Sequence, residues 1–390
     1  MTQKWLLPEY IDDILPAEAW RIEKLRASVL ELFTLSGYEL VMPPLVEYLD
    51  SLLTGSGHDL GLRTFKLVDQ LSGRTLGLRA DITPQASRID AHLLNRQGIT
   101  RLCYSGSVVH TLPTGMLKTR EPLQIGAEIY GHAGVESDVE IQLLMLRALA
   151  VAGVNNVHLD LGHVAIFRSL IQWAGIDRES EAELFRVLQA KDVAALDTMT
   201  GSLGKDVRRA LCALPELYGG VEVLQEARKR LPKLPELAAC LDTLEFLAEQ
   251  LSKDVAQVCV DLAELRGYHY HSGAVFEAYV PGQTEAIARG GRYDEIGKSF
   301  GRARPATGFS IDLRDLASLV DGDGQRKRIM ASHKLDDAGL QAAIQALRDA
   351  GNIVIVDLPG HEDNRDELGC HEELVMRDGQ WVVVPRDRAK

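Results

Sequence analysis

The chain has 390 residues, of which 46% are hydrophobic and 25% are charged, and its formal net charge is −13. This composition is typical of a globular protein with two or three cores, and the acidic balance disfavours a broad nucleic-acid-binding surface. No leader pattern and no run of roughly 20 apolar residues occurs, so we expect a cytoplasmic protein without a membrane span. The five cysteines are scattered without a CxxC pair, which favours reduced thiols over disulfides or zinc ligands.

The N-terminal stretch predicts a helix followed by a strand. Pro16 suits a first helical turn and apolar residues recur at helical spacing, so we predict a helix over residues 16–35 with Gly37 as its C-terminal cap. The following GYELVMPPLVEY predicts a strand that its two prolines stop. Residues 53–61, LTGSGHDLG, lack the GxGxxG spacing and a preceding hydrophobic strand, so we interpret them as a loop.

Residues 64–79 predict two strands around a Ser-Gly turn, and they lead to Asp81 and Thr83 in front of a helix. A carboxylate and a hydroxyl at this place have two interpretations. They can accept hydrogen bonds from the first N–H groups of the helix, or they can bind the amino group of a ligand. Taken alone the capping interpretation is favoured, and the polar residues described next shift the balance toward ligand binding.

The most informative stretch is residues 101–128, RLCYSGSVVHTLPTGMLKTREPLQIGAE. It predicts a hairpin with a long tip, formed by a strand over 102–109, a loop rich in Gly, Pro and Thr, and a return strand over 123–130. His110 and Leu112 follow the entering strand. Neutral histidine and leucine are poor partners for a phosphate, because the first is mostly uncharged at pH 7 and the second forms no hydrogen bond.

The middle of the chain alternates between sheet and helix. We predict a helix over 135–152 closed by Gly153, a strand over 157–161, and a helical insertion over about 164–252. The insertion shows no pattern of catalytic or metal-binding residues. A structural or partner-contacting role is therefore expected for it.

The sheet resumes at 258–262 and leads to LRGYHYHSGAVFEAYV, which contains Arg266, Tyr270 and His271. The guanidinium of Arg266 suits a carboxylate, which it can bind through two parallel hydrogen bonds. On a strand His269 and His271 would share a face, so a metal-binding pair has to be weighed. No adjacent cysteine or carboxylate completes a ligand set, and we expect no metal.

The last part of the chain predicts the end of the core and a small additional domain. ARGGRYDEIG, residues 288–297, has glycines that allow close backbone approach, and GFSIDLRDL, which contains Asp315, predicts a strand and a helix. DGDGQ, residues 321–325, reads as a linker. Residues 326–390 then predict a small α/β domain, with a helix from Asp337 to 348 and a hairpin at an Asp-Gly turn.

Together these motifs resemble the class II histidyl-tRNA synthetases. The helix, strand and proline at 16–44 are similar to motif 1, the 101–128 hairpin to motif 2, and GFSIDLRDL to motif 3, while RGYHYH and ARGGRYDEIG are similar to the histidine-specific motifs. The resemblance implies an α+β fold with an antiparallel sheet core and flanking helices over 1–320. It also implies a dimer formed through motif 1.

The chain departs from the synthetase pattern in the nucleotide half and keeps it in the amino-acid half. His110 and Leu112 stand where the family has an arginine and a glutamate that bind ATP, and Asp315 stands where motif 3 presents an arginine. The resemblance implies a histidine site made of Asp81, Thr83, Gln124, Glu128, Arg266, Tyr270 and His271.

REPLQIGAE and RGYHYHSG also resemble the ATP phosphoribosyltransferase regulatory subunits, which are paralogues of these synthetases. That resemblance implies a non-catalytic protein that assembles with the short catalytic subunit, HisG, in the first step of histidine biosynthesis. Histidine would be the feedback effector, and no cofactor, nucleic acid or membrane partner is expected. Two alternatives stay open: a diverged but active synthetase, and a free-standing histidine sensor or RNA-binding adaptor.

Overall fold

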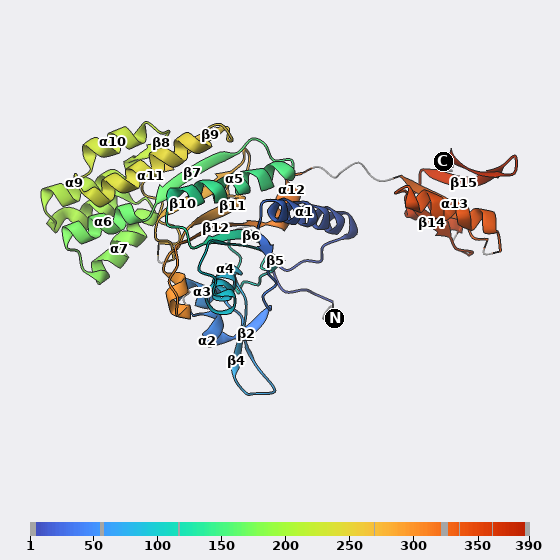
Figure 1. The fold of residues 1–390 in the computed structure, drawn as a ribbon, viewed down its shortest axis with the longest axis horizontal. Coiled ribbons are helices and arrows are strands. Elements are labelled where there is room, and N and C mark those ends of the chain that lie inside the picture. The colour runs from blue at the N-terminus through green and yellow to red at the C-terminus, as the bar shows by residue number, and fades with distance from the viewer. Residues whose placement is uncertain are drawn as a thin grey trace. The chain divides into compact units, whose positions relative to one another are not determined.

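The protein divides into two units, Met1–Val320 and Asp321–Lys390, which are described separately (Figure 1). The computed structural model describes residues 5–54, 58–115, 118–268, 270–320, 327–334, 336–360 and 362–386. The predicted linker at 321–325 lies outside these residues.

The first unit is organised around a large mixed sheet. Within the described residues the sheet has nine strands, whose spatial order is β1 (Glu39–Leu40), β5 (Thr100–Ser107), β6 (Leu123–Tyr130), β12 (Ala306–Asp312), β11 (Ala288–Arg292), β10 (Ala274–Tyr279), β7 (His158–His163), β9 (Gln257–Asp261) and β8 (Tyr218–Gly219). Neighbours from β5 to β7 are antiparallel, while β1 is parallel to β5 and β9 to β7. The predicted α+β class with an antiparallel core is confirmed.

Helix α1 (Pro16–Leu35) begins and ends at the predicted residues. Its buried residues Ile22, Leu25, Val29 and Phe33 form one stripe, because they recur at intervals of three and four. Each such side chain contributes about 1.5–3 kcal/mol when it is buried. Gly37 has a φ of 86°, a left-handed conformation that suits the predicted cap.

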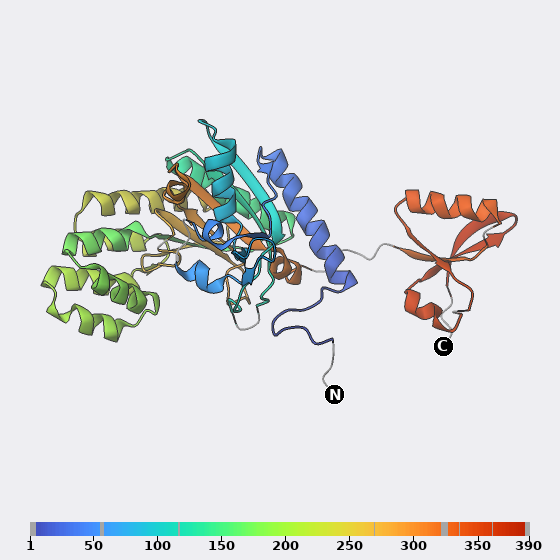
Figure 2. The same ribbon diagram turned by 90° about the horizontal axis from the view of Figure 1, so that it is seen from below.

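Helices α5 (Val135–Val151) and α12 (Leu313–Ser318) pack against α1, and α5 also packs on β12. Figure 2 shows α1, in blue, lying alongside the sheet. Their packing places the start of α12, and with it Asp312 and Asp315, beside the β5–β6 hairpin. Leu123 N donates a hydrogen bond of 3.2 Å to Asp312 Oδ1, which ties the hairpin to α12.

The helical insertion lies beyond β7 and β9, where its green and yellow helices gather at one end of the sheet (Figures 1 and 2). Its α-helices are α6 (Ala165–Ala174), α7 (Arg178–Gln189), α8 (Val193–Met199), α9 (Lys205–Ala213), α10 (Val223–Arg230) and α11 (Pro235–Leu251). Helix α11 joins them to the core, because it packs on α5, α6 and β7.

A smaller sheet with order β2 (Val46–Tyr48), β4 (Thr75–Leu78) and β3 (Lys66–Val68) flanks the site. It confirms the predicted strand pair, with the turn residue Gly73 at a φ of 69°. Helix α2 (Leu49–Leu52) follows β2, and α4 (Thr83–Arg88) starts at Thr83 and continues into the π-helix Ile89–Leu94.

The loop interpretation of residues 53–61 is wrong in its second part. Helix α3 (His58–Arg63) begins at residue 58, while residues 55–57 lie outside the described structure. Thr111 Oγ1 donates to Leu62 O at 2.7 Å and Thr111 N donates to Arg63 O at 3.0 Å, so the end of α3 is held by the chain that follows β5. These tertiary contacts override the local preference that the glycines indicate.

The second unit is a four-stranded sheet with one long helix. Its sheet order is β14 (Ile353–Asp357), β13 (Arg328–Ser332), β15 (Glu372–Arg377) and β16 (Gln380–Pro385). Asp337 caps α13 (Ala338–Asp349) by accepting a hydrogen bond of 2.9 Å from Leu340 N. Positive φ angles of 48° and 78° at Asp378 and Gly379 form the predicted hairpin turn.

The structure also bears on the expectations for the cysteines and for a membrane span. All five cysteines are free thiols, and four of them are buried. Within the described residues, none of the helices combines the length and apolarity that a membrane crossing requires.

Candidate functional site

A cavity of about 420 Å³ opens beside β6, β10, β11 and β12, under the tip of the β5–β6 hairpin. The predicted site residues that line it are Asp81, His110, Gln124, Arg266, His271 and Asp315. Those that do not line it are Thr83, Leu112, Glu128 and Tyr270. The cavity therefore brings four of the seven amino-acid positions and two of the three nucleotide positions of the synthetase pattern to one place.

Asp81 and Gln124 form the centre of the amino-acid half. Gln124 Nε2 donates to Asp81 Oδ1 at 2.8 Å, and Gln124 Oε1 accepts from Ile82 N at 2.9 Å. Thr83 N also donates to Asp81 Oδ1, at 3.0 Å. Asp81 thus accepts a hydrogen bond from the first N–H group of α4, as the capping interpretation requires. Because the hydrogen bonds from described residues fall on Oδ1, Oδ2 can accept from a cationic group in the cavity.

Glu128 lies behind this pair, 1% exposed. Its two oxygens accept hydrogen bonds from Tyr104 Oη at 2.9 Å and Tyr293 Oη at 2.5 Å. Burial raises the pKa of Glu128 to about 8, although the two hydrogen bonds oppose the shift. The raised pKa favours the protonated form of Glu128 at neutral pH.

Glycines on the two neighbouring strands make room for this carboxyl group. Gly308 of β12 pairs with Glu128 of β6, and a Cβ at residue 308 would lie 1.4 Å from Glu128 Oε2. A Cβ at Gly126 would lie 2.6 Å from Tyr104 Oη. No larger residue fits at these positions while Glu128 and Tyr104 keep their places.

Tyr270 contributes a buried hydroxyl that has no hydrogen-bond partner within the described residues. Its ring lies 5.1 Å from the ring of Tyr293. Nearby, Thr83 Oγ1 lies 2.9 Å from Tyr104 Oη, so Thr83 belongs to the same hydrogen-bonded group as Glu128. Buried hydroxyls are usually hydrogen-bonded, which makes the Tyr270 hydroxyl a candidate ligand contact.

Arg266 lines the cavity but already has a carboxylate partner. Its Nη1 donates to Glu277 Oε2 at 2.6 Å and to Tyr279 Oη at 3.3 Å, and Arg289 pairs with the other oxygen of Glu277 at 2.9 Å. A ligand carboxylate would therefore share the Arg266 guanidinium with Glu277. The side chain of Arg266 is 53% exposed, so its remaining donors are accessible.

His271 is a neutral group in the cavity wall. Burial lowers its pKa to about 4. Its Nδ1 lies 3.3 Å from the carbonyl oxygen of Arg292, where a neutral imidazole can donate its one N–H.

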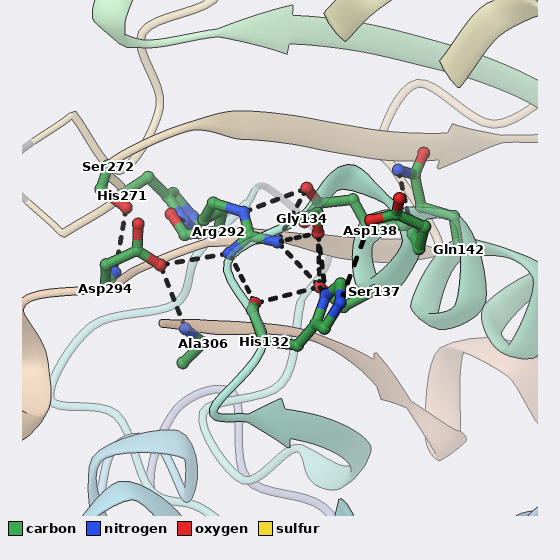
Figure 3. Close-up of polar contacts among 11 residues, drawn as sticks. His132, Gly134, Ser137, Asp138, Gln142, His271, Ser272, Arg292, Asp294 and Ala306 are labelled. Atoms are coloured by element: carbon green, nitrogen blue, oxygen red, sulfur yellow. Dashed lines mark hydrogen bonds and ion pairs between the residues drawn. The ribbon is translucent and has the colours of Figure 1, made fainter. Parts of the chain in front are cut away.

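A buried hydrogen-bond network holds Arg292 of β11, whose carbonyl oxygen faces His271 (Figure 3). Arg292 Nε and Nη2 lie 3.0 Å from Asp138 Oδ2, and Nη2 also donates to Ser137 Oγ at 2.9 Å. Further acceptors are the carbonyl oxygens of His132 and Gly134 and the carboxylate of Asp294. The network joins β11 to the start of α5, and Arg292 O in turn accepts from Ser272 N at 2.8 Å.

The nucleotide half has charges that differ from the synthetase pattern. His110 is 5% exposed, and its pKa is lowered by burial and by the adjacent Arg63, whose Nη2 lies 3.2 Å from Nε2. Asp315 Oδ2 pairs with Lys118 Nζ at 2.6 Å. Leu112 is 70% exposed and lies outside the cavity lining.

Sequence reasoning missed Arg63, Lys118, Tyr104 and the role of Tyr293. Arg63 and Lys118 come from α3 and the hairpin tip, and only the tertiary fold brings them to His110 and Asp315. Tyr104 was detectable, because its alternation with Leu102 in β5 marks it as a buried position.

The possible histidine metal pair has no support in the described residues. The described residues from 266 to 271 form turns and not a strand, because Gly267 adopts a φ of 66° and its carbonyl accepts from both Tyr270 N and His271 N. His269 lies outside the described residues. Among the residues that are described, no group of three or more His, Cys, Asp or Glu side chains could hold a metal ion.

Comparison with known families matches both units. A family model described as "Histidyl-tRNA synthetase" matches residues 10–316. A second, described as "ATP phosphoribosyltransferase subunit HisZ C-terminal domain", matches residues 326–384.

Curated relatives match over nearly the whole length. The chain is 58% identical over 384 residues to the "ATP phosphoribosyltransferase regulatory subunit" of Nitrosospira multiformis, covering 97% of this chain and 98% of that one. It is 59% identical over 382 residues to the protein of the same name from Burkholderia lata, covering 98% and 99%.

Solved structures share the fold. A protein from Bacillus halodurans, described as an "ATP phosphoribosyltransferase regulatory subunit/histidyl-tRNA synthetase", matches with a TM-score of 0.83 at 27% identity, covering 95% of this chain and 97% of that one. Histidyl-tRNA synthetase from Nostoc matches with a TM-score of 0.78 at 18% identity, covering 98% and 97%, and that likeness concerns the fold alone.

Proposed function

This chain belongs to the family of ATP phosphoribosyltransferase regulatory subunits, and from that membership we propose a two-part function for it. It is a non-catalytic subunit that the short catalytic subunit, HisG, requires for activity in the first step of histidine biosynthesis. It also binds L-histidine in the cavity and conveys feedback inhibition to the complex.

The observation that carries the non-catalytic part is the ion pair between Lys118 and Asp315, 2.6 Å long, at the position where the synthetase pattern has an ATP-binding arginine. The pair carries no net charge, so this position lacks the cation that an arginine would offer a phosphate, an attraction of about 4 kcal/mol for unit charges 4 Å apart at an effective permittivity near 20. The lowered pKa of His110 adds to this, because a neutral imidazole supplies no charge to replace the second arginine.

The amino-acid half supplies groups for each part of a histidine molecule. Asp81 Oδ2 suits the ammonium group and Arg266 the carboxylate, while the groups assigned to the imidazole are the hydroxyl of Tyr270 and the carboxyl of Glu128, which lie outside the residues that line the cavity. Thr83, Gln124 and His271 complete the set as the residues that hold or flank these groups. Charge-assisted hydrogen bonds contribute about 1.5–3 kcal/mol each, and about 8 kcal/mol in total corresponds to micromolar affinity.

Feedback requires only that the cavity bind histidine more tightly in the inhibited assembly than in the active one. A difference of about 1–3 kcal/mol between the two assemblies is typical of such coupling.

Calorimetry with the isolated chain tests the histidine part. We expect micromolar-class binding of L-histidine, and Arg266→Ala should weaken it about 30- to 1000-fold because the ligand carboxylate loses its cation. The matched control is Arg314→Ala, whose Nη1 contacts only Thr119 Oγ1 and Glu121 O among the described residues, at 3.5 and 3.4 Å. Equal histidine affinity in all three proteins would place the effector elsewhere.

A histidine-dependent exchange of pyrophosphate into ATP would contradict the non-catalytic part. That reaction is the first half of aminoacylation, so its presence would favour the diverged synthetase instead.

A further inference from the structure

Three residues of the candidate site, Arg266, Tyr270 and His271, lie on one short turn. We call the described residues 266–268 and 270–271 the pocket turn. Arg266, Gly267 and His271 line the cavity, and the ring of Tyr270 lies against that of Tyr293. A small displacement of the pocket turn therefore changes several of the groups that face a ligand.

Tyr268 anchors the pocket turn to the helical insertion. Its side chain is 3% exposed and lies between Phe167 of α6 and Phe185 of α7, with ring centroids 5.4 Å apart in both pairs. Its hydroxyl donates a hydrogen bond of 2.7 Å to Glu181 of α7. Two helices of the insertion thus contact the same residue of the turn.

Arg168 of α6 provides a second connection. Its Nη2 donates to the carbonyl oxygens of Tyr268 and His271, both at 3.3 Å, so one guanidinium bridges the middle and the end of the turn. The same guanidinium lies 5.1 Å from the centre of the Tyr268 ring. A shift of α6 is therefore transmitted to Tyr268 and His271 together.

The turn has little freedom to absorb such a shift. Gly267 adopts a φ of 66°, and a Cβ there would lie 2.6 Å from the His271 ring. On its other side Ser272 N donates to Arg292 O at 2.8 Å, and Arg292 is held by the buried network of Figure 3. The insertion, through Arg168 and Tyr268, is the second support of the turn beside the strand side.

We propose that Arg168 and Tyr268 are positioning residues that couple the helical insertion to the amino-acid site. A movement of α6 and α7 changes the geometry of the pocket turn, and a ligand that binds against the turn restrains those helices in return. The inference rests on the proposed function for the identity of the ligand, L-histidine. The coupling itself rests on the contacts of the turn.

The test combines hydrogen exchange and calorimetry on the full chain with the variants Arg168→Met and Tyr268→Phe. The control is Arg186→Met on α7, an arginine whose Nε contacts the carbonyl of Ala182 in its own helix. In the free protein, Arg168→Met should accelerate exchange of the Tyr270 and His271 amides about tenfold or more while β7 and β10 keep their protection. Histidine affinity should fall about 5- to 100-fold in Arg168→Met and less in Tyr268→Phe.

The reciprocal effect separates coupling from mere support of the fold. Addition of L-histidine should slow exchange in α7 of the wild-type chain, and Tyr268→Phe, which keeps the ring and removes the contact to Glu181, should reduce that protection. Exchange of the turn amides and of α7 that equals the Arg186→Met control in every variant overturns the inference. A wild-type chain that binds no histidine contradicts the proposed function, and the free-protein exchange then still decides the coupling.

Discussion

Glu128 is the residue whose environment differs most from that of an exposed carboxyl group. Burial raises its pKa from the usual 4.5 to about 8, so the folded protein keeps this proton when the unfolded chain has released it. The carboxyl therefore contributes stability that is fully present below pH 4.5 and is lost as the pH rises toward 8.

The variant Glu128→Gln isolates this effect, because an amide of nearly the same shape does not titrate. The free energy of unfolding of the wild type should fall relative to the variant between pH 5 and pH 9, by on the order of 4 kcal/mol. Urea denaturation at the two pH values measures the difference. A wild type and a variant with the same pH dependence would show that Glu128 ionises normally.

The nucleotide positions predict that the isolated chain binds ATP weakly or not at all. The lowered pKa of His110 favours its neutral form, and Asp315 is paired with Lys118. Leu112 has an apolar side chain and does not line the cavity. Titration calorimetry with Mg-ATP should give no heat of binding at micromolar concentrations. In a filter-binding assay, the histidine-specific tRNA should not be retained by the chain. Micromolar ATP affinity would show that Arg63, next to His110, restores the lost contact.

At this scale six of the ten positions named from the sequence line the cavity, and sequence reasoning missed how they are paired. Asp81 and Gln124 were assigned to one site, and they form a direct hydrogen bond. The partners of Arg266 and Asp315 were not predictable, because Glu277 and Lys118 reach them from other strands and loops. Local patterns carry no information about such pairings.

Elements with a repeating apolar pattern and clear ends were the ones predicted well. Helix α1 has a proline at its start and a glycine after its end, and its predicted limits are those observed. A strand was considered for the pocket turn only as the condition for a histidine pair, and Gly267 at a φ of 66° permits the turn that is observed instead. Helix α3 was missed, since glycines near it masked a short helix held by tertiary contacts.

The Arg292 network predicts a large stability effect at the junction of β11 and α5. Arg292→Met would leave the carboxylate of Asp138 buried without its cation, which typically costs about 3–5 kcal/mol. Arg208→Met is the matched control, because its ion pair with Asp197 is exposed on the insertion, with side chains 45% and 56% accessible, and such pairs contribute about 0–1 kcal/mol. Equal loss of stability in both variants, measured by urea denaturation, would contradict the structural role assigned to the network.

At the scale of the whole molecule, the resemblance to motif 1 predicts a homodimer through residues 37–47. This stretch exposes apolar side chains in the single chain, with Leu40, Met42 and Leu45 being 45%, 77% and 40% accessible. Light scattering at tens of micromolar should give the mass of a dimer, and Met42→Asp should shift the equilibrium toward monomer because it buries a charge at the interface. A monomeric wild type at that concentration would refute the assignment.

The curated relatives of this chain are named regulatory subunits, a name that implies a partner catalytic subunit. Under the proposed function, the synthetase-like unit binds the amino acid and the partner carries out the chemistry. Reconstitution is therefore the most direct test. The chain is mixed with the short catalytic subunit, and the condensation of ATP with phosphoribosyl pyrophosphate is followed with and without L-histidine. We predict activity that requires both proteins and falls on addition of histidine, with Arg266→Ala shifting the inhibition to higher concentration. Full, histidine-sensitive activity of the catalytic subunit alone, or no activity in the mixture, would contradict the account.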